Sequence, residues 1–138
     1  MFDIKQYLKD GLKNTLLFRN NSGVSYNGPW KQVYENTLLD RWHVGDFSSV
    51  EYTISADLDT ENKEIIKALV TATVDRASIV IYARNNTLRD LITITPTVNN
   101  SYVDITLNPA TTTPAGLNDG VKVIYTAHYF HNQNPLTP

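Results

Sequence analysis

The segment IIKALVTATVDRASIVIYAR, residues 65–84, decides the fold because it joins two β-branched runs through the short polar stretch Asp75-Arg76. In the first run every second residue is apolar, which is the period of a β-strand with one buried face. These residues are Ile66, Ala68, Val70, Ala72 and Val74, and Lys67 falls on the opposite face. The second run continues the apolar face with Ile79, Ile81 and Ala83. Because Asp-Arg is not a favoured two-residue turn, we expect either a longer loop that includes Ala77 or a bend between sheets.

Similar alternation occurs on both sides of this hairpin. Apolar and polar residues alternate over 50–56, 102–107 and 121–130, and the run LITIT at 91–95 reaches Pro96, which should end a strand or place it at a sheet edge. Asn99-Asn100 offers a hairpin turn. Short strands separated by turns about every 8–12 residues predict an all-β fold, an antiparallel β-sandwich of jelly-roll or immunoglobulin-like type. The predicted core contains Ile66, Val70, Ile79, Ile81, Ile105 and Val123.

The N-terminal part of the chain has a different pattern. Ile4, Leu8 and Leu12 recur every four residues, which predicts a short amphipathic helix over about residues 3–10. A helix of this length is not stable alone, so it packs either on its own domain or on a neighbouring subunit. The Asn-, Ser- and Gly-rich stretch at 19–29 is predicted to be a loop. A helix and a loop are thus expected to precede the β-strands.

Composition restricts the classes of partner. The formal net charge is −2, so no overall basic field draws this chain onto nucleic acid or anionic lipid. No apolar run approaches the roughly 20 residues that span a bilayer, and the N-terminus lacks the order of a signal peptide. The absence of cysteine excludes a disulfide framework, a thiolate metal site and a thiol nucleophile. We expect no nucleic-acid partner and no membrane partner.

The three histidines are the remaining candidates for chemistry. His128 and His131 are three residues apart, which places them on opposite faces of a strand and disfavours joint zinc binding. His43 is either a packed side chain or a metal ligand. The sequence has no G-x-S-x-G nucleophile elbow, no H-E-x-x-H zinc motif and no glycine-rich phosphate loop. We expect no catalytic residues, no metal and no cofactor.

Three strings carry a resemblance to a known family: DRWHVGDFSSVEYTI at 40–54, KALVTATVDRASIVIYARNNTL at 67–88 and YTAHYFHNQNP at 125–135. They resemble a module found in virion structural proteins of marine T4-like cyanophages. The resemblance covers about residues 38–135, and residues 1–37 lie outside the recurring module. Together with the amphipathic stripe and the loop, this divides the chain into an attachment segment, residues 1–37, and a β-sandwich domain, residues 38–138. It implies a particle component and brings no catalytic residues with it.

The resemblance implies a non-enzymatic assembly component of the tail, neck or baseplate, located in the virion and assembled in the host cytoplasm. Its implied partners are other virion proteins and further copies of itself, in a ring or trimer. The predicted interaction surface consists of Ile4, Leu8, Leu12, Trp30, Trp42 and Tyr129. The alternatives are a carbohydrate-binding or host-recognition appendage that stacks sugars on Trp30, Trp42 and exposed tyrosines, a capsid decoration protein, and a small hydrolase.

Overall fold

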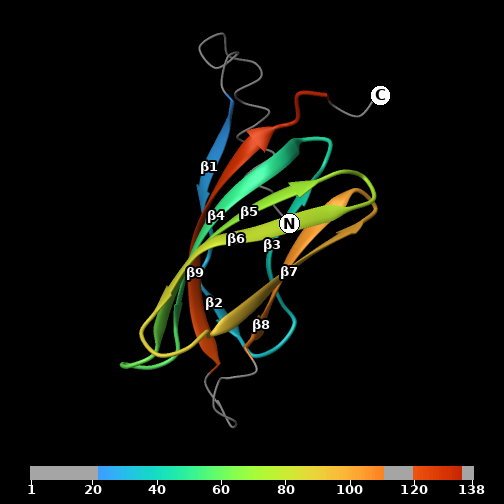
Figure 1. Cartoon of the computed structure of the whole chain (residues 1–138). Coiled ribbons are helices and arrows are strands. Elements are labelled where there is room, and N and C mark those ends of the chain that lie inside the picture. Colours follow the sequence, from blue (N-terminus) through green and yellow to red (C-terminus); the bar gives the residue numbers. More distant parts are fainter. Residues whose placement is uncertain (1–21, 111–119, 135–138) are drawn as a thin grey trace.

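The computed structural model describes residues 22–110 and 120–134, and the regular structure of these residues is all β. The strands pack as two antiparallel sheets, which confirms the predicted sandwich (Figure 1). In chain order they are β1 (Gly23–Asn27), β2 (Lys31–Val33), β3 (Thr37–His43), β4 (Phe47–Asp57), β5 (Lys63–Ala72), β6 (Ala77–Asn86), β7 (Ile92–Asn99), β8 (Tyr102–Pro109) and β9 (Val121–His131). No helix long and apolar enough to cross a membrane occurs among the described residues.

The larger sheet has the strand order β1-β9-β4-β5-β6, and β2 also pairs with β9. The two short strands β1 and β2 share one side of β9: β1 pairs with residues 126–130 and β2 with residues 121–123. On its other side β9 pairs with β4 over almost its whole length. The far edge of this sheet is β6, which among the described strands pairs only with β5.

The smaller sheet has the order β3-β8-β7. A tight turn joins β7 and β8 as predicted, but it is one residue later than Asn99-Asn100: Asn99 still pairs with Tyr102, and the turn residues Asn100 and Ser101 have φ values of 54° and 66°. Two consecutive residues with positive φ are typical of the tight hairpin turn whose twist matches that of the strands. Pro96 lies inside β7 and opposite Ile105, and since β7 is an edge strand the alternative of an edge position is confirmed.

The core lies between the two sheets and consists of the inward-facing residues of both. Ile66, Val70, Ile105 and Val123 are fully buried, as predicted, and Ile79 is half-buried against the same cluster. Ile81 is an exception, because 37 % of its surface is exposed. It faces the core side but lies on the edge strand β6, where fewer side chains cover it. The prediction that Ile81 is inside is therefore wrong.

A longer loop closes the hairpin of β5 and β6, as one of the two predicted alternatives has it, but Ala77, predicted to lie in that loop, is the first residue of β6 and pairs with Ala72. The Thr73 N–H donates to the Arg76 carbonyl at 2.8 Å, and Val74, predicted to face the core, is exposed in this loop. A bulge follows in β6, where Ile81 pairs with Ala68 but Ala83 pairs with Lys67. Tyr82 is the extra residue, and it reverses the alternation, so Arg84 rather than Ala83 lies on the inner face.

The N-terminal predictions have mixed outcomes. The helix over residues 3–10, with Ile4, Leu8 and Leu12, lies outside the described residues. The loop predicted at 19–29 is wrong over Gly23–Asn27, which form β1 of the larger sheet. A Cβ at Gly23 would lie 1.8 Å from the Tyr129 carbonyl oxygen, so this glycine permits close strand approach rather than a turn. Part of the segment 1–37 thus belongs to the sandwich, while its attachment role stays a prediction.

Candidate interaction surface

Two of the aromatic residues predicted at the surface are in the core. Trp42 is 2 % exposed and its indole N–H donates to the Tyr52 hydroxyl at 3.0 Å, while Tyr129 is fully buried. These two side chains cannot form an interaction surface, and the prediction is wrong for both. Trp30 is 56 % exposed and stays available. The polar atoms of Trp42 and Tyr129 find partners inside the core, which makes their burial favourable.

The partner of these aromatic residues is the carboxylate of Asp40. β3 has a bulge at Leu39, which turns Asp40 inward opposite Ile105. The hydroxyls of Tyr52 and Tyr129 donate to its Oδ2 at 2.8 Å and 2.7 Å. Burial, together with the nearby charge of Asp40, raises the pKa of Tyr52 and Tyr129 above the ordinary tyrosine value, so both stay protonated donors. The cluster therefore joins β3 of one sheet to β4 and β9 of the other.

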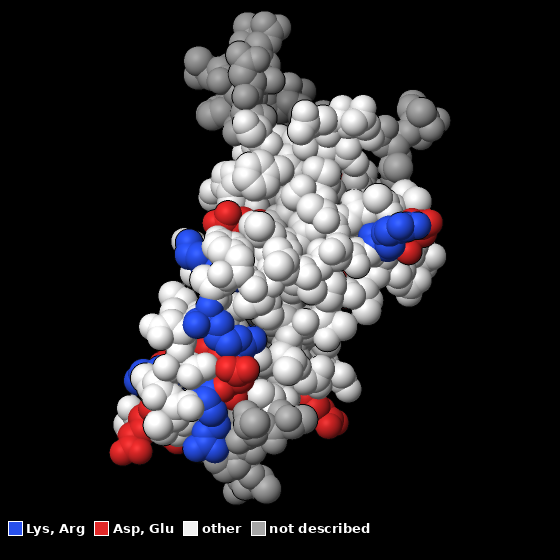
Figure 2. Space-filling model, in the orientation of Figure 1, with Lys and Arg blue, Asp and Glu red and all other residues white. Residues whose placement is uncertain are grey.

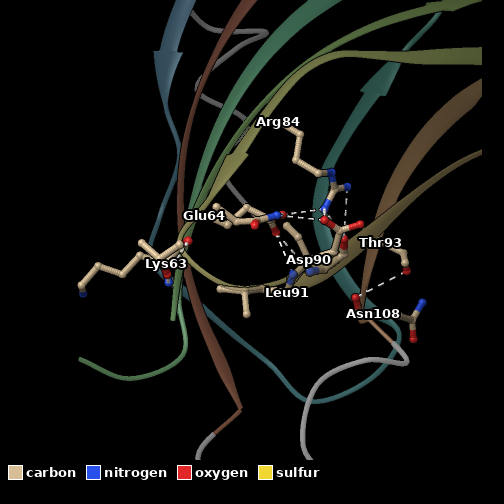
Figure 3. Close-up of polar contacts among 10 residues, drawn as sticks. Lys63, Glu64, Arg84, Asp90, Leu91, Thr93 and Asn108 are labelled. Atoms are coloured by element: carbon tan, nitrogen blue, oxygen red, sulfur yellow. Dashed lines mark hydrogen bonds and ion pairs between the residues drawn. The ribbon is translucent and has the colours of Figure 1, made fainter. Parts of the chain in front are cut away.

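A second buried carboxylate holds the crossing from β6 to β7 (Figure 3). The side chain of Glu64 is fully buried, and its Oε1 lies 2.6 Å from Arg84 Nη1. Its Oε2 accepts from the backbone N–H groups of Leu91 at 2.9 Å and Ile92 at 3.3 Å. Asp90 lies 3.5 Å from the same guanidinium nitrogen. These contacts use both oxygens of Glu64 to fix where the chain passes from one sheet to the other.

The histidines do not come together. The His43 ring accepts a hydrogen bond from the Gly45 N–H at 2.9 Å and packs edge-on against Tyr102, whereas His131 stacks on Phe47. His128 faces outward from the larger sheet. Over residues 22–110 and 120–134, no group of three His, Asp or Glu residues is placed to hold a metal ion.

The edges of β6 and β7 form an uncharged flank of the sandwich. β6 carries no charge from Ala77 to Ala83, and β7 carries none over its whole length. In Figure 2 the charged side chains lie mainly at the left, at the lower end and at one spot on the far right, and the surface between them, where Figure 1 places the half of β6 that follows the β5–β6 loop, is white. On the uncharged part of β6, Val80 and Tyr82 are 52 % and 48 % exposed. A rigid scaffold thus exposes apolar and aromatic side chains without a charge among them.

The sheet edges differ in how they are protected against pairing with another chain. Natural proteins protect edge strands by keeping them short or by adding bulges, prolines and charges. β1 and β2 are short and separated by Gly28-Pro29-Trp30, β3 has its bulge and the exposed Arg41, and β7 has Pro96 at its middle. β6 has a bulge only from Tyr82 onward. Among the described edges, residues 77–81 of β6 form the one run without such protection.

The outer face of the larger sheet also has a polar row across β1, β9 and β4. Ser25 Oγ lies 2.8 Å from His128 Nδ1, and Glu51 is paired opposite His128 on the other side. The ring of Phe130 packs edge-on against His128 at a centroid distance of 4.7 Å and is 39 % exposed. Hydroxyl, imidazole and carboxylate groups beside a partly exposed aromatic ring can bind a hydroxylated ligand.

Sequence reasoning found neither surface. The apolar run over residues 79–82 predicted a strand, but nothing in the sequence places that strand at a sheet edge. The polar row depends on the pairing of β1, which was expected to be a loop. The alternation of Val24 and Tyr26 inward with Ser25 outward is the signal that could have identified it.

Comparisons with known proteins give structural likeness alone. No family model matches the chain, and no curated protein matches it. A tailspike protein of Acinetobacter baumannii phage AM24 matches 80 % of this chain at 11 % identity and a TM-score of 0.42. Tailspike gp49 of bacteriophage Fri1, a capsular polysaccharide depolymerase, matches 84 % at 16 % identity and a TM-score of 0.42. The tailspike of Acinetobacter phage vB_ApiP_P1 matches 86 % at 10 % identity and a TM-score of 0.37. The matched regions are 26 %, 20 % and 24 % of the three tailspike chains.

Proposed function

We propose that this chain is a structural module of a phage particle, in the tail or a host-recognition appendage, and that it acts by binding rather than by catalysis. The observation that carries the proposal is the uncharged flank, where the unprotected run of β6 lies at the edge of a rigid sandwich. An exposed edge of this kind is a template for pairing with another chain. The resemblance of three strings to a virion module supports the same role.

The two buried polar clusters support a rigid role for the scaffold. Asp40, on β3 of the smaller sheet, binds Tyr52 and Tyr129 of the larger sheet. Glu64, on β5 of the larger sheet, binds the backbone where the chain enters β7 of the smaller sheet, so the two sheets are fixed relative to each other. A rigid module loses little conformational freedom when it binds. In a particle, symmetry places copies at high local concentration, so contacts that are weak in solution are sufficient for assembly.

The test is whether the protein is present in particles. Antibodies against the recombinant chain are used for immunogold electron microscopy of the phage that encodes it, and purified particles are analysed by mass spectrometry. We expect label on the tail or its appendages and peptides of this chain in purified particles. Presence in the infected-cell lysate with absence from purified particles would contradict the proposal.

The polar row favours a second candidate function, binding of a host saccharide. Phe130 offers a ring face to the apolar side of a sugar, and Ser25, His128 and Glu51 offer hydrogen bonds to its hydroxyls. This site replaces the predicted platform that included Trp42, which is buried. On a glycan array, wild-type protein should bind and Phe130→Ala should not, whereas Ile124→Ala, on the same strand and face, should bind like wild type. No binding by the wild-type chain contradicts this function.

A further inference from the structure

We infer that β6 of one copy pairs antiparallel with β6 of a second copy through residues Ala77–Ile81, forming a two-fold dimer. The inference rests on the proposed binding role and names the partner of the uncharged flank. It begins from the backbone: β6 pairs with β5 on one side, and no described strand pairs with it on the other. The open side of such a strand presents N–H and C=O groups that favour another strand.

The side chains of this run agree with that expectation. Residues 77–81 contain no charge and no proline, and the bulge begins only at Tyr82. Ile79 and Ile81 face the inner side, and Val80 faces the outer side opposite Leu69, which is itself 41 % exposed. The outer face also carries Ser78, so the inner face is apolar and the outer face is uncharged with an exposed apolar residue, a pattern typical of a strand in the middle of a sheet.

A second copy is the occupant that the edges favour. Pairing needs a partner edge without breaks, and a copy of this chain offers the same unprotected run. The other edges described in the copy are interrupted by the gap between β1 and β2, by the bulge of β3 or by Pro96 of β7. When β6 of one copy pairs with β6 of another, uncharged residues face uncharged residues across the two strands. This avoids the repulsion between like charges on facing strands. Because the same patch is used on both sides, the assembly closes as a dimer.

The geometry also selects a register. With a two-fold axis normal to the sheet, each residue stays on its own face, so opposed residues lie on the same face and one residue of β6 lies opposite its own copy, with the axis between the two. With the axis at Ile79, Ala77 opposes Ile81 and Ser78 opposes Val80, and the pairing covers the whole run before the bulge. If Val80 were at the axis, Arg76 of one copy would lie opposite Arg84 of the other, so two like charges would face each other. The ladder would also extend into the bulge at Tyr82. The register centred on Ile79 avoids both costs.

Cysteine cross-linking tests the register directly, because the chain has no cysteine of its own. Directly opposed residues have Cα atoms about 4.5–5.5 Å apart, within the span of a disulfide, whereas diagonal neighbours are about 7–8 Å apart. The double variant Ser78→Cys/Val80→Cys should form a covalent dimer under mild oxidation. Val80→Cys alone should stay monomeric on a non-reducing gel, because Val80 is diagonal to its own copy. Ile124→Cys is the matched control, since Ile124 is 55 % exposed on the same face but lies on the inner strand β9.

Self-association is measured separately by light scattering coupled to size exclusion over a range of concentrations. Wild-type protein should dimerise as concentration rises, Val80→Lys should weaken dimerisation at least about tenfold, and Ile124→Lys should behave like wild type. A monomeric wild type together with no cross-link in the double variant overturns the pairing. Equal cross-linking of Val80→Cys alone overturns the register. Neither result depends on particle labelling, so failure of the dimer and failure of the proposed function are distinguishable.

Discussion

Replacing Glu64 by Gln tests whether the buried carboxylate holds the two sheets together. The substitution keeps the shape of the side chain and removes its charge. In the wild type, Oε1 lies 2.6 Å from Arg84 Nη1, and Oε2 accepts from the N–H groups of Leu91 and Ile92. A glutamine amide has one acceptor oxygen and one NH₂ donor, so it leaves either the guanidinium or the two backbone donors facing another donor.

The expected loss of stability follows from these contacts. Breaking a buried ion pair by removing one partner costs about 3–5 kcal/mol, and losing a hydrogen bond to a charged group costs about 1.5–3 kcal/mol. Arg84 is 21 % exposed and keeps Asp90 at 3.5 Å, which reduces the cost of leaving it without Glu64. We therefore expect Glu64→Gln to lower the free energy of unfolding by about 3 kcal/mol.

The assay is urea denaturation followed by circular dichroism and tryptophan fluorescence, with Asp104→Asn as the control. Asp104 forms a bidentate pair with Arg41, at 2.5 Å and 3.1 Å, but the Arg41 side chain is 55 % exposed. Loss of an exposed pair should cost at most about 1 kcal/mol. A loss below about 1 kcal/mol for Glu64→Gln, or equal losses for the two variants, would refute the argument that the buried pair anchors the crossing.

Three further predictions concern the core and the edges. Burial and the charge of Asp40 raise the pKa of Tyr52, Tyr125 and Tyr129 in the folded protein. The free energy of unfolding should therefore be constant up to about pH 10, the ordinary pKa of tyrosine, and should fall as the pH rises above that value. In an alkaline titration, tyrosinate absorbance from these residues should appear only as the fold is lost. Val70→Asp should abolish the cooperative melting transition because Val70 is fully buried, whereas Ile81→Asp, at a half-covered edge position, should leave a folded protein; equal loss in both variants would contradict the edge position of β6. Pro96→Thr should restore a backbone donor to the edge of β7 and increase concentration-dependent light scattering; unchanged scattering would show that Pro96 does not protect this edge.

Periodicity was sufficient to predict the sandwich and most of its strands. The alternation around Val50, Val70 and Ile105 has a period of two, and each of these residues is buried. Asn99-Asn100 predicted a tight turn, and the structure has one there, shifted by one residue to Asn100-Ser101. Alternation and turn residues depend on local sequence alone, so a single sequence is enough to predict them.

Bulges are the feature that periodicity could not predict. An extra residue at Leu39 turns Asp40 into the core, and one at Tyr82 turns Arg84 towards Glu64. Tyr129 is different, because it is in phase with the buried Val123 and Tyr125, so the alternation of β9 already places it inside. In sequence Asp40 and Arg84 have the character of solvent-exposed residues. Their burial depends on a donor and an acceptor that come from distant strands, for which no local pattern exists.

Glycine occurs both in loops and where two segments pack closely, and the sequence alone does not distinguish these two roles. Gly23 and Gly28 lie in an Asn- and Ser-rich stretch that is typical of a loop. In the structure each allows close packing: a Cβ at Gly28 would lie 1.9 Å from the Tyr125 ring, and one at Gly23 would meet the β9 backbone. β1 was missed because the residues that let it approach β9 are the ones that break strands elsewhere.

The run Ile79-Val80-Ile81-Tyr82 differs from Asp40 and Arg84, because it is less buried than its sequence predicts. The described residues leave part of these four side chains exposed. Consecutive apolar residues are typical of strands that are covered on both faces. The structure places this run at the edge of the larger sheet, where Val80 is 52 % exposed and Tyr82 is 48 % exposed. This run would lie in the middle of a sheet if a strand of a partner paired with β6 and so continued the larger sheet. The mismatch between the pattern of β6 and its place in the fold is therefore itself the physical argument for a partner at this edge.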